Sequence, residues 1–254
     1  MKITFLGVGE AFDEKESHVC ILVEASGRRM IIDCGSTAPP EIWKNCERPD
    51  YLDGIFISHF HADHFFGLPA LMMRMWEDGR TRPFYLFGPL GMQKRVEVLM
   101  ESAYPGSMPR RDGKEGGIPF TLRFRELQRS HRWDDWNLRV VNTKHSVQNL
   151  GLRLEAGKKV LCYSGDGMFT PTAAKLYSNA SLIIHESYKE SSTELRKRTH
   201  CTIDQLERLD DMARPKQIAL VHLHRDLRKK RASILKKHRT RNWIIPKKGE
   251  CLEI

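Results

Sequence analysis

The densest group of reactive side chains in this sequence is the run Ser58-His-Phe-His-Ala-Asp-His64, which places three imidazoles and a carboxylate within six residues. Imidazole nitrogens and carboxylate oxygens are the ligands of hydrolytic zinc sites. His59 and His61 lie two residues apart, so in an extended segment they point to the same side. Asp63 and His64 can reach a second position nearby. The run can therefore supply two metals, and paired metals are a common means of hydrolysing phosphate esters.

The sequence around this run predicts how it is held. Residues 52–57 are apolar and strand-like, and residues 65–72 are helix-like. A strand, a ligand-bearing loop and a helix make a suitable frame for a metal site. A lone His-x-His pair can arise by chance in a chain with 11 histidines, but this context favours a metal site.

Further ligands are available at the ends of other predicted strands. His145, Asp166 and His222 each follow an apolar, β-rich stretch. Any one of them alone is typical of a structural residue, but together with the first run they complete two ligand sets. His224 is ambiguous, because it lies two residues after His222 on the same predicted strand.

Strands and helices alternate along the whole chain. Strands are expected near residues 2–7, 19–24, 28–33, 54–58, 84–87, 120–125, 137–143, 150–155, 159–163, 181–185, 217–222 and 243–245. Helices are expected near residues 39–45, 65–78, 89–102, 171–177, 202–212 and 225–238. Thr202 with Gln205 three residues later predicts a capping box. The Gly/Pro-rich loop 105–119 is expected at the surface, either as a plain connector or as a gate to the cleft.

These residues together resemble the metallo-β-lactamase superfamily. Its pattern is His-x-His-x-Asp-His, a later His, a Gly-Asp-Gly and a final strand-end His. The similarity runs nearly end to end, from the opening strand and glycine turn at 2–11 to the segment 31–35, where the family Asp orients ligands. The resemblance implies an α/β fold, the αββα sandwich of two mixed β-sheets flanked by helices, in one hydrolase domain over residues 1–254.

Within the superfamily the chain is most similar to the phosphodiesterase branch, which holds RNase Z-like tRNA 3′-processing endonucleases and the small phosphodiesterase of carbon–phosphorus lyase pathways. The segments 182–186 and 200–202 carry this similarity. It implies that one metal is bound by His59, His61 and His145. It implies that the other is bound by Asp63, His64 and His222. Asp166 would bridge the two metals around a shared hydroxide, and His224 would lie outside the ligand set.

The resemblance also implies three catalytic candidates, Asp63, His200 and Glu186. His200 could protonate the departing alkoxide, a task suited to an imidazole near neutral pH, and Glu186 could orient it. The alternative for His200 is an ordinary loop residue, and Glu186 could equally be a solvated acid or one that supports a ligand. Asp33 could accept a hydrogen bond from a ligand imidazole and so fix its tautomer. The implied cofactors are two divalent metal ions, by default Zn²⁺, with Mn²⁺ or Fe²⁺ as alternatives.

Composition limits the class of protein and the cellular compartment that we expect. The 254 residues suffice for one large domain with a buried core, and no apolar run of about 18 residues predicts a membrane span. The chain opens directly into a strand without a signal-peptide pattern. Its six cysteines include no Cys-x-x-Cys pair, which argues against a disulfide scaffold or a thiolate zinc site. We therefore expect a cytoplasmic protein that does not act at a membrane.

Positive charge is concentrated near the C-terminus. The net charge is +10, yet residues 214–248 hold 13 lysines and arginines against a single acid. Such a segment beside a phosphodiester site could contact nucleic acid or phosphate, although a solvated helix face is the common alternative. The candidate contact residues are Arg228, Lys229, Lys230 and Arg231.

These observations favour a dinuclear-metal phosphodiesterase whose partner is a small or medium phosphodiester, such as a cyclic nucleotide. The alternative is an RNase Z-like endoribonuclease, or another nuclease of RNA or single-stranded DNA. RNase Z enzymes often insert a tRNA-gripping arm between the strand-end His and the bridging Asp, whereas only 20 residues separate His145 from Asp166. A thioester hydrolase shares the ligands but not the segments around Glu186 and His200. A non-hydrolytic relic is disfavoured by the complete ligand set. A homodimer is expected from the resemblance alone.

Overall fold

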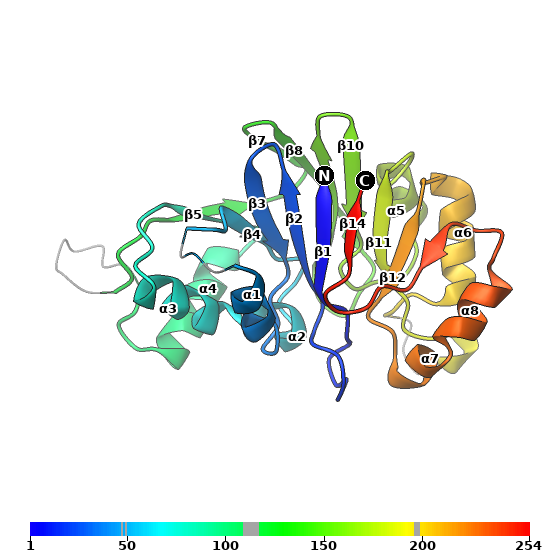
Figure 1. Ribbon diagram of the computed structural model, residues 1–254, viewed down its shortest axis with the longest axis horizontal. Helices are drawn as coiled ribbons and strands as arrows, with labels where there is room; N and C mark the ends of the chain where they lie inside the picture. Colours follow the sequence, from blue (N-terminus) through cyan, green and yellow to red (C-terminus); the bar gives the residue numbers. More distant parts are fainter. Residues whose placement is uncertain (47, 49, 109–116, 196–198) are drawn as a thin grey trace.

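Two facing β-sheets form the centre of the computed structural model, which describes residues 1–46, 48, 50–108, 117–195 and 199–254 (Figure 1). The first sheet has the order β14 (Cys251–Glu253), β1 (Lys2–Gly7), β2 (Cys20–Ala25), β3 (Arg28–Ile32), β4 (Gly54–Phe56), β5 (Phe84–Gly88) and β6 (Leu122–Glu126). The second has the order β13 (Trp243–Ile244), β12 (Ile218–Val221), β11 (Leu182–Glu186), β10 (Lys159–Tyr163), β9 (Asn149–Ala156), β8 (Trp136–Thr143) and β7 (Ser130–Trp133). Each sheet combines parallel and antiparallel pairs.

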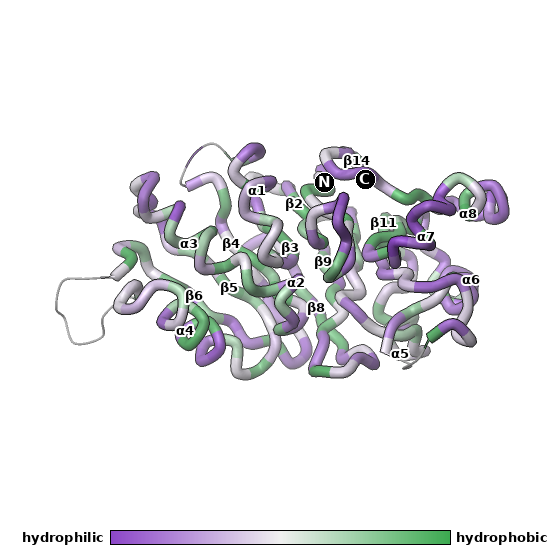
Figure 2. Tube along the Cα trace, turned by 90° about the horizontal axis from the view of Figure 1, so that it is seen from below, coloured by the Kyte–Doolittle hydropathy of each residue, from purple (hydrophilic) through white to green (hydrophobic). Residues whose placement is uncertain are grey.

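Helices cover the outer face of each sheet. On the first sheet lie α1 (Pro39–Asn45), α3 (Leu68–Glu77) and α4 (Met92–Ala103), and on the second lie α5 (Pro171–Leu176), α6 (Ile203–Ala213), α7 (Arg225–Lys229) and α8 (Arg231–Lys237) (Figure 1). The short helix α2 (Ala62–Phe65) lies at the lower edge of the sandwich in that view. Seen from below, hydrophobic residues gather along the strands, whereas the chain around α7 is strongly hydrophilic (Figure 2). The predicted sandwich of two mixed sheets flanked by helices is confirmed.

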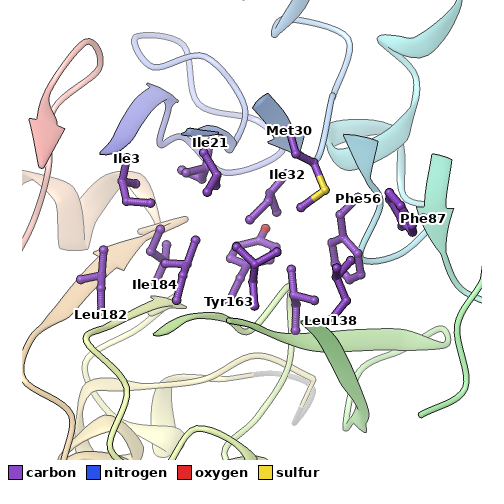
Figure 3. Close-up of a cluster of buried hydrophobic side chains, with 14 of the residues drawn as sticks. Ile3, Ile21, Met30, Ile32, Phe56, Phe87, Leu138, Tyr163, Leu182 and Ile184 are labelled. Carbon is purple, nitrogen blue, oxygen red and sulfur yellow. The ribbon is translucent and has the colours of Figure 1, made fainter. Parts of the chain in front are cut away.

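The largest apolar cluster fills the space between the sheets. Figure 3 shows Ile32 and Phe56 of the first sheet facing Leu138 and Tyr163 of the second, all of them buried. The central strands β4, β11 and β12 are buried on both faces. Strands β4 and β12 are apolar throughout, and β11 is apolar up to its last two residues, His185 and Glu186. Strand β8 instead alternates buried and partly exposed residues, as a strand with one covered face does. These patterns are the reason the sequence predicts most of the strands.

Two predicted helices are each divided in two. The helix expected over 225–238 is broken at Lys230, which ends α7 and precedes α8 with a non-helical backbone. The helix expected over 65–78 is α2 followed by α3, because Phe66 and Gly67 separate them and Pro69 occupies the first turn of α3.

One further prediction is wrong, two strands were missed, and part of one predicted loop lies outside the described residues. The capping box at Thr202 is wrong, since the Thr202 hydroxyl donates to the Asp204 carboxylate instead of accepting from the helix. Strands β7 and β14 were not predicted, and both are short strands, β7 at a sheet edge and β14 pairing outside β1. Of the loop 105–119, residues 109–116 lie outside the described part. The Ile118 amide donates to the Ser107 carbonyl (2.8 Å), so the described flanks of the loop are joined.

Among the described residues, no helix has the length and apolar character that crossing a membrane requires.

Candidate metal centre

The predicted ligand segments meet at one edge of the sandwich. The first run follows β4 and is extended at His61, which lies at the N-cap of α2. His145 follows β8, Asp166 follows β10 and His222 directly follows β12. Strands from both sheets therefore end at the site, and each delivers a polar side chain there.

One compact group consists of three imidazoles. The Nδ1 atom of His61 lies 3.1 Å from Nε2 of His59 and 3.2 Å from Nε2 of His145. Burial holds the pKa of His59 well below its usual range, and neighbouring imidazoles add to the effect. Burial also lowers the pKa of His61. His59 and His61 are therefore neutral at physiological pH, with ring nitrogens turned toward one point.

A second compact group combines two carboxylates with two imidazoles. The Nε2 atom of His64 lies 3.2 Å from Asp63 Oδ2 and 3.4 Å from Asp166 Oδ1. The Nε2 atom of His222 lies 3.3 Å from Asp63 Oδ2 and 3.5 Å from Asp166 Oδ2. All four residues are buried. Asp166 also groups with His145 of the first set, so it lies between the two sets.

Both groups fit divalent metals. Bonds of 2.0–2.1 Å in a tetrahedral zinc site separate neighbouring ligand atoms by about 3.3–3.4 Å, and the facing atoms here are spaced 3.1–3.5 Å apart. The buried atoms His64 Nε2 and Asp166 Oδ1 have no hydrogen-bond partner among the described residues. Buried polar atoms rarely stay unpartnered in a folded protein, so these two indicate a position for a ligand such as a cation.

The charges within the second group also indicate a position for a cation. Burial alone would raise the pKa of Asp166 and lower that of His64. Because the two groups attract each other, the pKa of Asp166 lies well below its usual range and that of His64 well above. The nearby imidazoles of His222 and His64 likewise overcome the effect of burial and keep the pKa of Asp63 low. Ionised carboxylates are thus present where a divalent metal would replace the imidazole protons.

A fully buried carboxylate supports the ligands. Asp33 Oδ2 lies 2.7 Å from His64 Nδ1 and accepts hydrogen bonds from the Ser58 and Tyr163 hydroxyls, each at 2.7 Å. The other oxygen, Oδ1, accepts from the Ser58 amide (2.7 Å). Ser58 Oγ is also 3.0 Å from His59 Nδ1. One carboxylate therefore contacts His64 directly and His59 through a hydroxyl, and the role of Asp33 in orienting metal ligands stays a prediction.

Sequence reasoning missed Ser58 and Tyr163. Ser58 adjoins the first ligand, and a hydroxyl at that place is a local signal that could have been used. Tyr163 lies 130 residues from Asp33 and comes from the opposite sheet. Only the packing of the two sheets brings them together, so no local pattern could have found it.

His200 and Glu186 lie beside the second group. His200 Nδ1 is 2.9 Å from Glu186 Oε2 and 3.9 Å from Asp166 Oδ2, and its ring stacks on Tyr188 with the ring centres 4.5 Å apart. Burial opposes the imidazolium, yet the Glu186 carboxylate raises the pKa of His200 to about 9. The other Glu186 oxygen accepts from the Gly167 amide. His200 is therefore held in place and is cationic at neutral pH.

Two ligand-bearing turns have unusual backbone conformations. Asp33 and His222 have left-handed φ values of 59° and 53°, which non-glycine residues adopt at a cost and often at functional sites. Gly165, next to Asp166, also has a positive φ, and a Cβ there would lie 2.3 Å from Asn149 Oδ1. The turn before Asp166 therefore requires glycine for both conformation and space.

His224 lies outside the metal-ligand groups found among the described residues. Its Nδ1 accepts hydrogen bonds from Lys189 Nζ (3.0 Å) and from the Asp226 amide (3.3 Å), and its ring packs edge-on against Tyr188. It therefore caps the start of α7, as expected for a residue outside the ligand set.

The four basic candidates contact protein groups. Arg228 is mostly covered and forms ion pairs with Asp13 (3.1 Å) and Glu14 (3.2 Å). Arg231 donates to the Ile245 carbonyl. Lys229 pairs with Asp226 at 3.4 Å and Lys230 with Glu190 at 3.3 Å, both at the surface. The structure thus gives Arg228 and Arg231 intramolecular roles and leaves the two lysines as the exposed members.

Comparison with known proteins places the chain among metallo-β-lactamase-fold hydrolases. The family model described as "Anti-Pycsar protein Apyc1" matches residues 1–244. A ribonuclease Z of Methanothermobacter thermautotrophicus is 24% identical over 88% of this chain and 86% of its own length. A ribonuclease Z of Methanococcus maripaludis is 36% identical over 105 residues, which cover 41% of this chain and only 34% of that relative.

Among solved structures, the metallo-β-lactamase fold protein YhfI of Bacillus subtilis superposes with a TM-score of 0.81 at 17% identity, over 99% of both chains. This likeness confirms the predicted fold class. Together with the relatives named ribonuclease Z, it confirms the resemblance to the superfamily and to its RNase Z-like branch, and it supports the prediction of a metal-dependent hydrolase.

Proposed function

The chain belongs to the Apyc1 family of metallo-β-lactamase-fold proteins, and from this premise we propose that it is a dinuclear-metal phosphodiesterase that acts on a small phosphodiester such as a cyclic nucleotide. One observation carries the proposal. Two compact groups of candidate ligands lie side by side, and Asp166 of the second group also lies close to His145 of the first. This is the arrangement that a two-metal hydrolytic site needs.

In this proposal His59, His61 and His145 hold one metal, and Asp63, His64 and His222 hold the other, with Asp166 between them. When bound, such metals lower the pKa of water and neutralise phosphoryl oxygens. The protein's own contribution is to fix the ligands. Asp33 sets the tautomer of His64, and Ser58 extends that control to His59. Zinc is the default for this ligand set.

We assign His200 the role of general acid. Its imidazolium is held by Glu186 beside the second ligand group. When the phosphorus–oxygen bond to the leaving group breaks, the proton on His200 passes to that oxygen and leaves a neutral alcohol. Tyr188, stacked on the ring, and Glu186, bonded to Nδ1, fix the direction of this transfer, so the proton donated is the one on Nε2.

A second candidate function is endonucleolytic processing of RNA, because two of the similar proteins are named ribonuclease Z. The short β9–β10 hairpin fills the interval between His145 and Asp166. Arg228 and Arg231 are engaged within the protein. Both features favour the small substrate over a long RNA.

The test uses zinc-reconstituted protein on bis(p-nitrophenyl) phosphate, a 2′,3′-cyclic nucleotide and a tRNA precursor with a 3′ trailer. We expect cleavage of the small esters, its loss with a chelator, and a loss of more than about a hundredfold in His61→Ala, because a ligand matters at least as much as its outer partners. Met212→Ala, on the outer surface of α6, is the control. Full activity in His61→Ala would contradict the mechanism, and trailer removal without ester cleavage would favour the nuclease.

A further inference from the structure

Phe12 is the most exposed of the large hydrophobic residues, with 75% of its surface accessible. It lies on the acidic loop between β1 and β2, which extends below the sandwich next to α2 and α7 (Figure 1). A single exposed aromatic residue carries no argument by itself. The informative features are the contacts that fix its loop and the two segments to which the loop is attached.

One side of the loop is attached to the segment of Asp63. The Ala11 carbonyl accepts a hydrogen bond from His18 Nε2 at 3.2 Å, and His18 is buried. Gly35 lies close to both this imidazole and the backbone of Asp63. A Cβ atom added to Gly35 would lie 2.5 Å from His18 Nδ1 and 2.0 Å from the Asp63 carbonyl oxygen. His18 thus fills the space between Ala11 and the backbone of the first ligand run.

The other side is attached to the segment of His222. The Phe12 carbonyl accepts from Arg225 Nη1 (3.2 Å), and the Phe12 amide donates to Glu10 Oε2 (2.9 Å). Arg225 also pairs with Glu10 at 3.4 Å and begins α7, three residues after His222. The His222 amide itself donates to the Val8 carbonyl (2.9 Å). Both backbone polar groups of Phe12 are therefore held by charged side chains.

The tip of the loop is fixed as well. Asp13 Oδ1 accepts hydrogen bonds from the amides of Lys15 (2.8 Å) and Glu16 (3.0 Å), and its other oxygen pairs with Arg228. The backbone of the loop is thus held on both sides of Phe12. Its contacts lead through His18 to the segment of Asp63 and through Arg225 to the segment of His222.

We propose that Phe12 is a substrate-binding residue whose exposed ring stacks on the planar base of a nucleotide phosphodiester held at the metal centre. The inference rests on the proposed function and deepens it, since it requires that the substrate carry a base. An aromatic face stacks on any base because every base has a π-face. The two arginines of α7 then serve substrate binding indirectly, by positioning the loop.

The test is calorimetric binding of adenosine 5′-monophosphate and ribose 5-phosphate to the zinc-loaded protein, because these ligands differ only by the base. We expect the wild type to prefer the nucleotide roughly tenfold, the scale of one base–aromatic stack. Phe12→Ala should reduce that preference to about twofold or less, and Phe12→Trp should retain it. Met212→Ala, which truncates another exposed hydrophobic residue, should leave it unchanged.

An unchanged preference in Phe12→Ala, or no preference in the wild type, would overturn the role of Phe12 alone. Failure of the wild type to bind either phosphate would also overturn this inference, whereas the proposed function is tested separately by cleavage of the small phosphodiesters. Since Phe12 is exposed, its truncation should not impair folding, and the retained affinity for ribose 5-phosphate reports an intact site.

Discussion

The metal-ligand edge and the basic segment 225–241 are both rich in charge, yet the protein treats them in opposite ways. At the ligand edge, His64 Nε2 and Asp166 Oδ1 are buried without hydrogen-bond partners in the described structure. In the basic segment, Arg228, Lys230 and Arg241 each contact protein acids, Arg241 at 2.8 Å from Asp211. The first region holds buried atoms that a bound cation could satisfy, and the charges of the second are largely paired within the chain.

This difference shows that charge counted in a sequence is not charge available to a partner. Buried polar atoms without partners cost free energy, so their persistence points to a bound group. Ion pairs at the surface contribute little to the free energy of unfolding, because water already solvates their charges. The function should therefore respond strongly to changes around the ligand edge and weakly to changes in the basic segment.

After the loss of a ligand such as His61, the largest effect should follow from Asp33→Asn. Asn tolerates the left-handed backbone at this position, where φ is 59°, and its carbonyl can still accept from Ser58. Its amide group cannot accept the proton of His64 Nδ1, so the ligand loses its tautomer control. We expect zinc affinity and kcat/KM to fall by about 10–100-fold, measured by competition with a chelator and by steady-state kinetics.

Tyr163→Phe is the matched control for this prediction. It removes one of the hydrogen bonds to Asp33 but leaves the contact between Asp33 and His64 intact. We expect a loss of about 1.5–3 kcal/mol in the free energy of unfolding, as for a hydrogen bond to a charged group, with zinc affinity largely retained. Equal losses of zinc affinity in both variants would contradict a specific role for the Asp33–His64 contact.

Much of the fold and the ligand set could be predicted because the signals are local. Strand β12 and the first three residues of β11 are continuous apolar runs, and the candidate ligands His145, Asp166 and His222 lie within three residues of the ends of β8, β10 and β12. Strands β7 and β14 were missed because they are short and depend on neighbours to form. Whether those ligands have the proposed roles stays a prediction.

Contacts between distant segments could not be predicted. Tyr163 meets Asp33 across the two sheets, and Arg228 meets Asp13 across more than 200 residues of chain. The sequence therefore indicates that the 225–241 segment is basic, but not that its arginines are already paired. The attachment of the Phe12 loop to two ligand segments likewise depends on tertiary contacts.

An intermediate effect is expected from Glu186→Gln. The Glu186 carboxylate raises the pKa of His200 to about 9 against the effect of burial. Removing its charge lowers that pKa, so the imidazolium loses its proton at lower pH. If His200 is the general acid, the alkaline limb of the kcat–pH profile should move to lower pH by about one unit or more.

Glu190→Gln is the control for that shift. Glu190 is an acid of the neighbouring loop that pairs with Lys230 and Lys237 at the surface, and its neutralisation should leave the profile in place. A fall in zinc content in Glu186→Gln without movement of the alkaline limb would instead indicate that His200 binds metal.

The smallest effect should follow from neutralising Lys229 and Lys230 together as Lys→Gln. These are the exposed members of the basic group, whereas Arg231 is left unchanged because it donates to the Ile245 carbonyl. Each lysine forms a surface ion pair, and such pairs contribute at most about 1 kcal/mol. We expect kcat/KM for bis(p-nitrophenyl) phosphate to stay within about twofold of the wild type, since a small ester needs only the nearby site.

Oligonucleotide binding, measured at several salt concentrations, tests whether these lysines contact nucleic acid. The double variant Lys158→Gln/Lys175→Gln removes the same charge from exposed positions elsewhere and corrects for the change in net charge. If both double variants lose affinity equally, the 225–241 segment has no special part in binding. A selective loss of about tenfold or more in Lys229→Gln/Lys230→Gln, with a shallower dependence on salt, would show that these lysines contact phosphates. The basic segment would then be a second functional region, and the endoribonuclease would replace the small-substrate phosphodiesterase as the better account.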